Sequence, residues 1–168
     1  MDYASKQPDA IIRFHASNMC LHIDSDAAYL VHPKARSCAA GHYYISDDPP
    51  PPHIRPTPTP NGPILTKCQT ILTAAEDKTG AIFLNNQKSV PIRTTLIEMG
   101  HLQPLTPIKT DIATSYGILT NNMCRKRSKA FNMCFHWMRC HIKQKQLRLY
   151  RQKRTENLAN NFTNHFLP

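Results

Sequence analysis

Two acidic residues, Asp24 and Asp26, follow a short apolar stretch and lie two positions apart. Residues 20–24 are predicted to form a β-strand, and side chains at positions i and i+2 of a strand point to the same face. If the strand continues through Asp26, two carboxylates lie side by side and repel each other unless a cation lies between them. A divalent cation with oxygen ligands is the usual solution. Asp-Ser-Asp is also favourable in turns and helix caps, so both interpretations stay open at this point.

A third acid, Asp111, ends a second predicted strand at residues 107–111. The intervening segment predicts helices at 74–84 and 90–99, with a kink or restart at Pro91 and a closing Gly100. Strand-end carboxylates that are separated by helices can meet at one edge of a mixed sheet. A two-metal phosphoryl-transfer site there needs several carboxylates to neutralise its cations.

The remaining pattern predicts one α/β or α+β domain with a single mixed sheet. A stretch of eight prolines at residues 47–63 interrupts it and is expected to form a surface loop, because proline cannot donate a ladder hydrogen bond. Further strands are predicted at 27–33 with 41–46, at 64–72 and at 146–150, and further helices at 113–119, 128–145 and 156–166.

The positive charge is concentrated in one part of the chain. The net charge is +10, and eleven of the 21 Lys and Arg residues lie between residues 125 and 154, where there is no acid. One basic face on a nearly neutral body is typical of a protein that binds a polyanion, with nucleic acid ahead of an anionic membrane. A solvated basic helix without a partner is the alternative. The candidate contacts are Arg125, Lys126, Arg127, Lys129, Arg139, Lys143 and Lys145.

The sequence predicts neither secretion nor membrane insertion. Asp2 and Lys6 interrupt the N-terminal region and no apolar segment follows, so no signal peptide is expected. No apolar run approaches the length of a membrane span. Neither a membrane nor a small-molecule substrate is therefore expected as a partner.

Several strings together resemble the ribonuclease H domain of copia-type LTR retrotransposon polyproteins. The resemblance covers residues 19–168, and residues 1–18 look like the remnant of a reverse transcriptase connection. Each string is weakly specific alone, but the set is specific. The strings are His22-Ile-Asp-Ser-Asp-Ala-Ala-Tyr29, His32-Pro-Lys-Ala-Arg-Ser37, Pro60-Asn-Gly-Pro-Ile64, Thr106-Pro-Ile-Lys-Thr-Asp111, Arg127-Ser-Lys-Ala130 and Thr155-Glu-Asn-Leu-Ala159 with Phe162-Thr163.

The resemblance implies a ribonuclease H-like fold, a five-stranded mixed sheet flanked by helices. It implies cleavage of the RNA strand of an RNA/DNA hybrid by two Mg²⁺ ions, held by an Asp, Glu, Asp, Asp set. It also implies a place in a larger polyprotein and, from the life cycle of such elements, a location in a cytoplasmic particle or the nucleus.

Carried over to this sequence, the resemblance places only two of the four acids. The first falls on Asp24, with Asp26 as neighbour or substitute, and the third falls on Asp111. The second position is occupied by Lys78 and the fourth by Asn160. We therefore expect a degenerate copy that binds Mg²⁺ weakly or not at all.

Three functional hypotheses follow from these substitutions. In the first, Asp24, Asp111 and a nearby acid, Glu76 or Asp77, still hold at least one metal and support cleavage. In the second, the domain binds nucleic acid through its basic face without catalysis. In the third, the chain is an inactive relic of the element.

Overall fold

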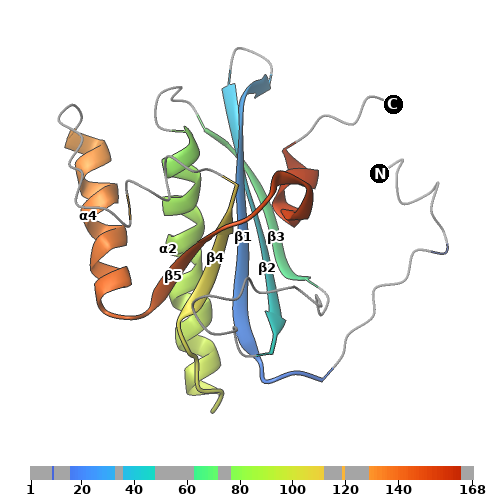
Figure 1. Ribbon diagram of the computed structural model, residues 1–168, viewed down its shortest axis with the longest axis vertical. Coiled ribbons are helices and arrows are strands. Elements are labelled where there is room, and N and C mark those ends of the chain that lie inside the picture. The colour runs from blue at the N-terminus through green and yellow to red at the C-terminus, as the bar shows by residue number, and fades with distance from the viewer. Residues whose placement is uncertain are drawn as a thin grey trace.

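The computed structural model shows one sheet with helices on its faces (Figure 1). It describes residues 9, 16–32, 36–47, 63–71, 77–111, 119 and 129–163. Three predictions therefore lie wholly or largely outside the described residues. They concern the N-terminal remnant at 1–18, the interior of the proline-rich loop and the helix at 113–119.

The sheet has five strands in the order β3-β2-β1-β4-β5, and it is mixed as expected. The first three strands pair antiparallel, while β4 pairs parallel with β1 and β5 pairs parallel with β4. The strands are β1 (Cys20–His32), β2 (Arg36–Ser46), β3 (Pro63–Ile71), β4 (Thr106–Thr110) and β5 (Leu147–Arg151).

Strand β1 is longer than predicted, because residues 27–32 continue it and do not begin a second strand. The strand therefore runs through both acids, which confirms that Asp24 and Asp26 share a face. Leu21 and Ile23 alternate with these polar residues and lie in the apolar core. The two faces of β1 thus carry different chemistry, one apolar and one charged.

Helices α2 (Asp77–Glu98) and α4 (Lys129–Lys143) cover the apolar face of the sheet. Figure 1 shows both helices on the same side of the strands. From α4, Phe135 and Met138 are buried in the core, as the predicted apolar stripe requires. No helix in the described part of the chain is long and apolar enough to cross a lipid bilayer.

The predicted restart at Pro91 is wrong, because α2 continues through this residue, while the alternative of a kink stays a prediction. Pro91 and Gln87, whose carbonyl loses its helical donor there, are both exposed, so water can satisfy that carbonyl. The predicted stop at Gly100 is confirmed. Gly100 has φ +93°, and its amide donates to the Ile97 carbonyl. The amide of His101 donates to the Leu96 carbonyl, and the two hydrogen bonds form a Schellman motif.

The predicted last helix at 156–166 is also wrong in type and extent. Two short 3₁₀ segments, η1 (Arg154–Glu156) and η2 (Leu158–Phe162), stand there and pack on the polar face of the sheet. Asn157 separates them with an extended backbone, accepts from the Ala159 amide and donates to the Ser25 carbonyl. This tertiary anchor prevents a continuous α-helix and holds the segment against β1.

Candidate functional site

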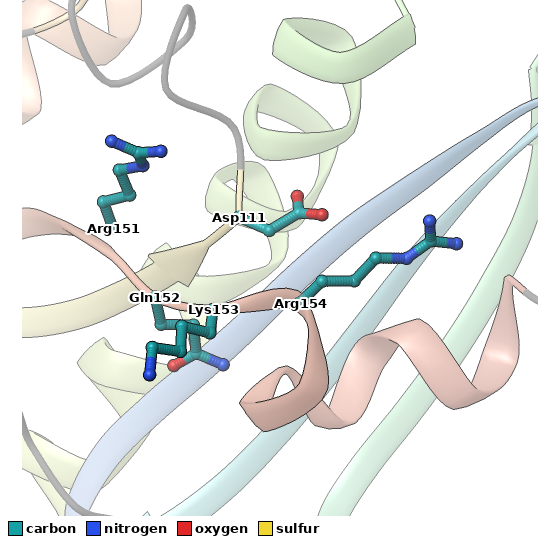
Figure 2. Close-up of a pocket in the computed structure, with 5 residues that line it drawn as sticks. All are labelled: Asp111, Arg151, Gln152, Lys153 and Arg154. Atoms are coloured by element: carbon teal, nitrogen blue, oxygen red, sulfur yellow. The ribbon is translucent and has the colours of Figure 1, made fainter.

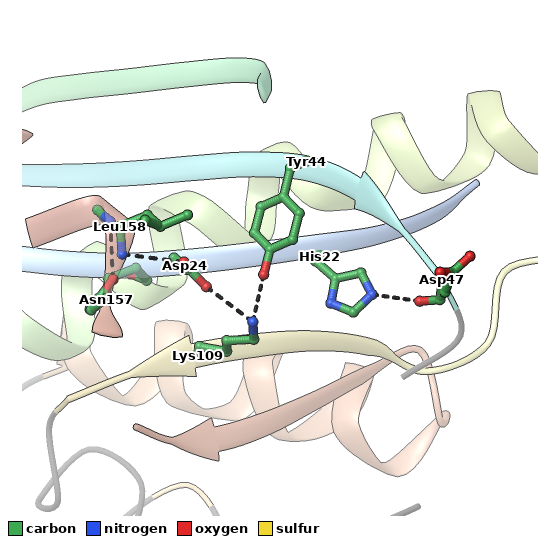
Figure 3. Close-up of polar contacts among 9 residues, drawn as sticks. His22, Asp24, Tyr44, Asp47, Lys109, Asn157 and Leu158 are labelled. Carbon is green, nitrogen blue, oxygen red and sulfur yellow. Dashed lines mark hydrogen bonds and ion pairs between the residues drawn. The ribbon is translucent and has the colours of Figure 1, made fainter. Parts of the chain in front are cut away.

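The parallel register of β1 and β4 places Asp24 directly beside Lys109. Both side chains are fully buried, with 0% and 1% of their surface exposed. The ammonium Nζ lies 3.8 Å from Asp24 Oδ1 and donates to the Tyr44 hydroxyl at 2.5 Å. Figure 3 shows this ammonium between the carboxylate and the tyrosine. A protein cation thus occupies the position beside the first predicted metal ligand.

The other oxygen of Asp24 is also held by the protein. The Leu158 amide at the start of η2 donates to Oδ2 at 3.3 Å. The neighbouring Asn157 side chain fixes this segment by donating to the Ser25 carbonyl at 3.0 Å (Figure 3). The Leu158 amide therefore binds Oδ2, whereas Oδ1 is buried without a hydrogen-bond partner among the described residues and has the Lys109 ammonium nearby.

Burial dominates the electrostatics of this pair. It raises the pKa of Asp24 from 3.8 to about 6, against the opposing effects of Lys109 and the Leu158 amide. It also lowers the pKa of Lys109, against the opposing effects of Asp24 and Glu156. The attraction between the carboxylate and the ammonium offsets only part of the cost of removing both groups from water.

The second acid of β1 has a different partner. Asp26 is 6% exposed, and its Oδ2 accepts a hydrogen bond from the Thr163 hydroxyl just after η2. Asp24 and Asp26 therefore lie on one face, as predicted, but separate partners from the C-terminal segment hold them.

The third acid, Asp111, follows β4 immediately and is half-buried. It lies two residues beyond Lys109 and so continues the same face of the sheet. Together with Arg151, Gln152, Lys153 and Arg154 it lines a cavity of about 430 Å³ (Figure 2). Asp111 thus shares its surroundings with three basic side chains.

The position predicted for the fourth acid carries an amide in contact with a cation. Asn160 lies in η2, and its Oδ1 accepts a hydrogen bond from Arg154 Nε at 3.1 Å. The carbonyl oxygen that could still have served a metal is therefore used by a guanidinium.

The remaining predicted residues are only partly described. Lys78 and Asp77 lie in the first turn of α2, but their side chains, like all of Glu76, are outside the described residues. Arg125, Lys126 and Arg127 lie outside them too, as does the side chain of Lys129. On α4, Arg139 lies over the Phe135 ring at 5.3 Å from its centroid. Lys143 and Lys145 are exposed at the end of this helix.

Two residues of the site were missed by the sequence reasoning. Lys109 lies in the string from Thr106 to Asp111, but the sequence predicted no role for it. Its spacing of two residues from Asp111 places both on one strand face. Arg154 was counted as basic charge only. No local pattern relates Lys109 to Asp24, because that contact depends on the register of two strands far apart in the sequence.

The donor set does not fit a Mg²⁺ ion at Asp24. Magnesium requires oxygen ligands at about 2.0–2.1 Å in octahedral geometry. Here the two oxygens of Asp24 face the Lys109 ammonium and the Leu158 amide. Among the side chains that the structure describes, no three His, Cys, Asp or Glu residues are grouped to hold a metal.

No protein-family model matches the sequence, and no curated protein is significantly similar to it. Solved structures with a similar fold are ribonuclease H domains. The N-terminal ribonuclease H domain of Rv2228c from Mycobacterium tuberculosis has a TM-score of 0.55 at 10% identity, over 85% of this chain and 92% of that one. LC11-RNase H1 in complex with an RNA/DNA hybrid has a TM-score of 0.56 at 7% identity, with the same coverage.

A viral polyprotein structure is also similar. The prototype foamy virus protease-reverse transcriptase has a TM-score of 0.51 at 11% identity, over 87% of this chain and 20% of that one. At such identities these likenesses establish the fold alone. The chain has a ribonuclease H-like fold, as predicted.

Proposed function

We propose that this chain is the ribonuclease H-like domain of a copia-type retrotransposon polyprotein, and that it binds an RNA/DNA hybrid or another nucleic acid. We further propose that its ancestral hybrid-cleaving activity is impaired. The observation that carries this proposal is the buried Lys109 ammonium, 3.8 Å from Asp24 Oδ1.

The ammonium opposes a metal at this position on electrostatic grounds. Two unit charges at about 4 Å interact by roughly 4 kcal/mol at an effective dielectric constant of 20, and a divalent ion about doubles this value. A cation beside Asp24 would have to displace Lys109 from a site in which it is 1% exposed. Even part of this repulsion lowers metal affinity by a factor of about 100 or more.

The substitutions at the other two acid positions act in the same direction. Lys78 replaces a carboxylate by a cation, and Asn160 keeps a carbonyl oxygen that accepts from Arg154. Nucleic-acid binding is supported by the basic charge between residues 125 and 154 and by the similarity to a domain solved with an RNA/DNA hybrid. The polyprotein context is supported by the similarity to a protease-reverse transcriptase.

The test combines binding and cleavage of a hybrid whose RNA strand is labelled. The wild-type chain is expected to bind the hybrid at low salt and to leave the RNA intact with Mg²⁺ present. A Lys78→Glu, Asn160→Asp double variant is expected to remain weak, because Lys109 is still in place. Adding Lys109→Gln to these changes is expected to produce cleavage that depends on Mg²⁺ and stops with EDTA.

The matched control adds Lys88→Gln in place of Lys109→Gln, because Lys88 is an exposed lysine on α2. Thermal melts of every variant show which of them are folded. Mg²⁺-dependent cleavage by the wild type that Asp24→Asn abolishes would show that the site is active and the proposal wrong. If the folded triple variant does not cleave the hybrid, the acid positions are misassigned. If the folded wild type does not bind the hybrid, the binding function is refuted.

A further inference from the structure

Helix α4 ends in the same hydrogen-bonded motif that closes α2 at Gly100, but with a lysine at the critical position. The Lys145 amide donates to the Ile142 carbonyl at 3.1 Å, and the Gln146 amide donates to the His141 carbonyl at 3.0 Å. Lys145 has φ +56°, as this motif requires. Glycine adopts such a left-handed conformation freely, whereas a side chain is strained there because its Cβ approaches the following carbonyl oxygen. The chain thus carries strain at the end of α4 that it avoids at the end of α2.

The side chain of Lys145 does not offset this strain by burial. Among the described residues, only Met19 and Lys145 combine a side chain with a positive φ. Met19 is partly buried and packs against the apolar core, so its side chain stabilises the fold. Lys145 is exposed, and its ammonium has no hydrogen bond or ion pair with a described residue. A strained position whose side chain does not serve the fold points to a function of that side chain.

The helix dipole does not explain the lysine either. A positive charge near the C-terminus of a helix is favourable, because the last carbonyls carry partial negative charge. Lys143 and His141 already lie in the last turn of α4, and Lys143 is exposed. Lys143 therefore supplies this interaction from helical backbone, without the strain at Lys145.

The backbone around Lys145 is fixed from two sides. The next residue, Gln146, accepts a hydrogen bond at its carbonyl from the Thr106 amide at 3.0 Å, which joins the turn to the start of β4. Its side-chain Oε1 lies 2.5 Å from His141 Nδ1, which joins it to α4. A group on a rigid turn loses little freedom when it binds a partner. The chain therefore presents the Lys145 side chain from a defined place on the surface.

The sequence around Lys145 favours an anionic partner. No Asp or Glu occurs between residues 125 and 154, which hold eleven basic residues. An exposed cation without an acidic partner among the described residues is suited to an external anion. The backbone of a nucleic acid offers such anions at regular spacing, and lysine contacts to its phosphates strengthen binding at low salt.

We propose that Lys145 contacts a backbone phosphate of the bound nucleic acid, and that the chain keeps a lysine at this position although it lowers stability. The inference rests on the proposed function, because it names a contact by which the domain holds its nucleic acid. Glycine at this position is then expected to raise stability and to lower affinity. A residue with a purely structural role does not produce this combination.

Four variants separate the charge from the strain. Lys145→Gln removes the charge and keeps the strained backbone, whereas Lys145→Gly removes both. As controls, Lys88→Gln removes an exposed charge on α2, and Gly100→Lys places a lysine in the same motif of the other helix. Thermal melts measure stability. Fluorescence anisotropy with a labelled RNA/DNA hybrid in EDTA measures affinity over a range of salt concentrations.

The two positions are expected to respond in opposite directions. Lys145→Gly should melt about 2–4 °C above the wild type, and Gly100→Lys should melt below it by a similar amount. Both Lys145 variants should bind the hybrid about tenfold more weakly at about 50 mM salt, and their slope of log affinity against log salt should be smaller by about 0.9. Lys88→Gln should bind within about twofold of the wild type, because this charge lies on α2.

The outcomes separate this inference from the proposed function. If the folded wild type binds the hybrid and Lys145→Gln loses no more affinity than Lys88→Gln, the contact is refuted while the binding function stands. If Lys145→Gly does not melt above the wild type, the lysine does not lower stability and the inference is wrong. If the folded wild type binds phosphatidylserine vesicles but not the hybrid, the nucleic-acid function itself is refuted.

Discussion

At the scale of single residues, the Asp24–Lys109 pair determines what this site can do. A buried carboxylate is neutralised by a metal, by a protein cation or by a proton, and here the ammonium of the neighbouring strand is in place. Breaking a buried ion pair from one side leaves an uncompensated charge. The pair is therefore best tested through variants that remove one partner or both.

The Lys109→Gln variant is expected to be destabilised by about 3–5 kcal/mol at pH 7.5, because Asp24 remains buried and charged. The loss is expected to be clearly smaller at pH 5. The pKa of Asp24 is raised to about 6 even beside Lys109. At pH 5 the Asp24 carboxyl of the variant is therefore protonated and neutral. Urea denaturation at both pH values measures the difference. The double variant with Asp24→Asn serves as control and should recover stability at pH 7.5, whereas equal losses at both pH values would contradict the prediction.

His22 and Asp24 are expected to give pH dependences of opposite sign. Burial lowers the pKa of His22 from 6.5 to about 4, so its contribution to folding is present above pH 6.5 and is lost as pH falls through 4. Burial raises the pKa of Asp24 from 3.8 to about 6, so its contribution is present below pH 3.8 and is lost as pH rises through 6.

The unfolding free energy of the wild type minus that of His22→Gln is therefore expected to fall by about 3 kcal/mol between pH 6.5 and pH 4. The corresponding difference for Asp24→Asn is expected to rise by a similar amount between pH 6 and pH 4. Chemical denaturation at several pH values measures both differences. The groups nearest to His22 are Tyr44, which stacks on its ring, Lys109 and Asp47, whose carbonyl contacts Nε2 at 2.9 Å (Figure 3). Differences of the same sign would refute the assignment.

At the scale of elements, the buried side-chain amide of Asn85 links helix α2 to the sheet in addition to their apolar packing. Asn85 Nδ2 donates to Ser25 Oγ and to the Ala40 carbonyl, both at 2.8 Å. The Tyr43 hydroxyl donates to Asn85 at 3.1 Å. This approach requires a glycine on β2, because a Cβ on Gly41 would lie 2.4 Å from Asn85 Oδ1. The helix that begins near Lys78 thus depends on contacts at its centre for its position.

Gly41→Ala is expected to destabilise the protein by about 1–3 kcal/mol through overpacking. Asn85→Ala is expected to cost a similar amount, because the buried Ala40 carbonyl and Ser25 hydroxyl lose the side-chain amide as donor. The double variant should lose less than the sum, since removing the Asn85 amide gives the new methyl group its space. A double-mutant cycle by urea denaturation measures the coupling, and additivity within about 0.5 kcal/mol would show that the two residues do not conflict.

At the scale of the whole molecule, the two faces of the sheet carry different kinds of residue. One face packs against α2 and α4 and forms the core, and the other carries the acids, Lys109 and the η2 segment. Basic residues that follow β5 lie beside Asp111, whereas those at the end of α4 belong to a helix that covers the opposite face of the sheet. Among the described residues, Asp24 and Asp26 thus have partners within the chain, from β4 and from the segment that follows β5.

Binding of an RNA/DNA hybrid is therefore expected to survive removal of metal. Affinity in EDTA should equal or exceed affinity in Mg²⁺, because divalent ions compete with the protein for backbone phosphates. A plot of log affinity against log salt should be linear, with a slope of about −0.9 for each phosphate contact. Fluorescence anisotropy with a labelled hybrid measures both quantities. Loss of binding in EDTA that Mg²⁺ restores would show that a metal takes part after all.

The sequence by itself determined the fold class, the approximate strands and several local features. The alternation along β1 separated Leu21 and Ile23 from Asp24 and Asp26, because a strand has a period of two. The glycine at position 100 marked the end of α2, because few other residues adopt its positive φ. The last helix was predicted wrongly, since the contact of Asn157 with Ser25 that divides it is not local.

Only the tertiary structure decided what surrounds the acids. Lys109 faces Asp24 because β4 pairs with β1 in one particular register, and Arg154 faces Asn160 because the segment after β5 folds back over β1. These contacts join residues far apart in the sequence, and their electrostatic effect depends on burial, which no local pattern specifies. The resemblance predicted Lys78 and Asn160 at two of the expected acid positions, and the structure places Lys109 beside Asp24 and Arg154 beside Asn160.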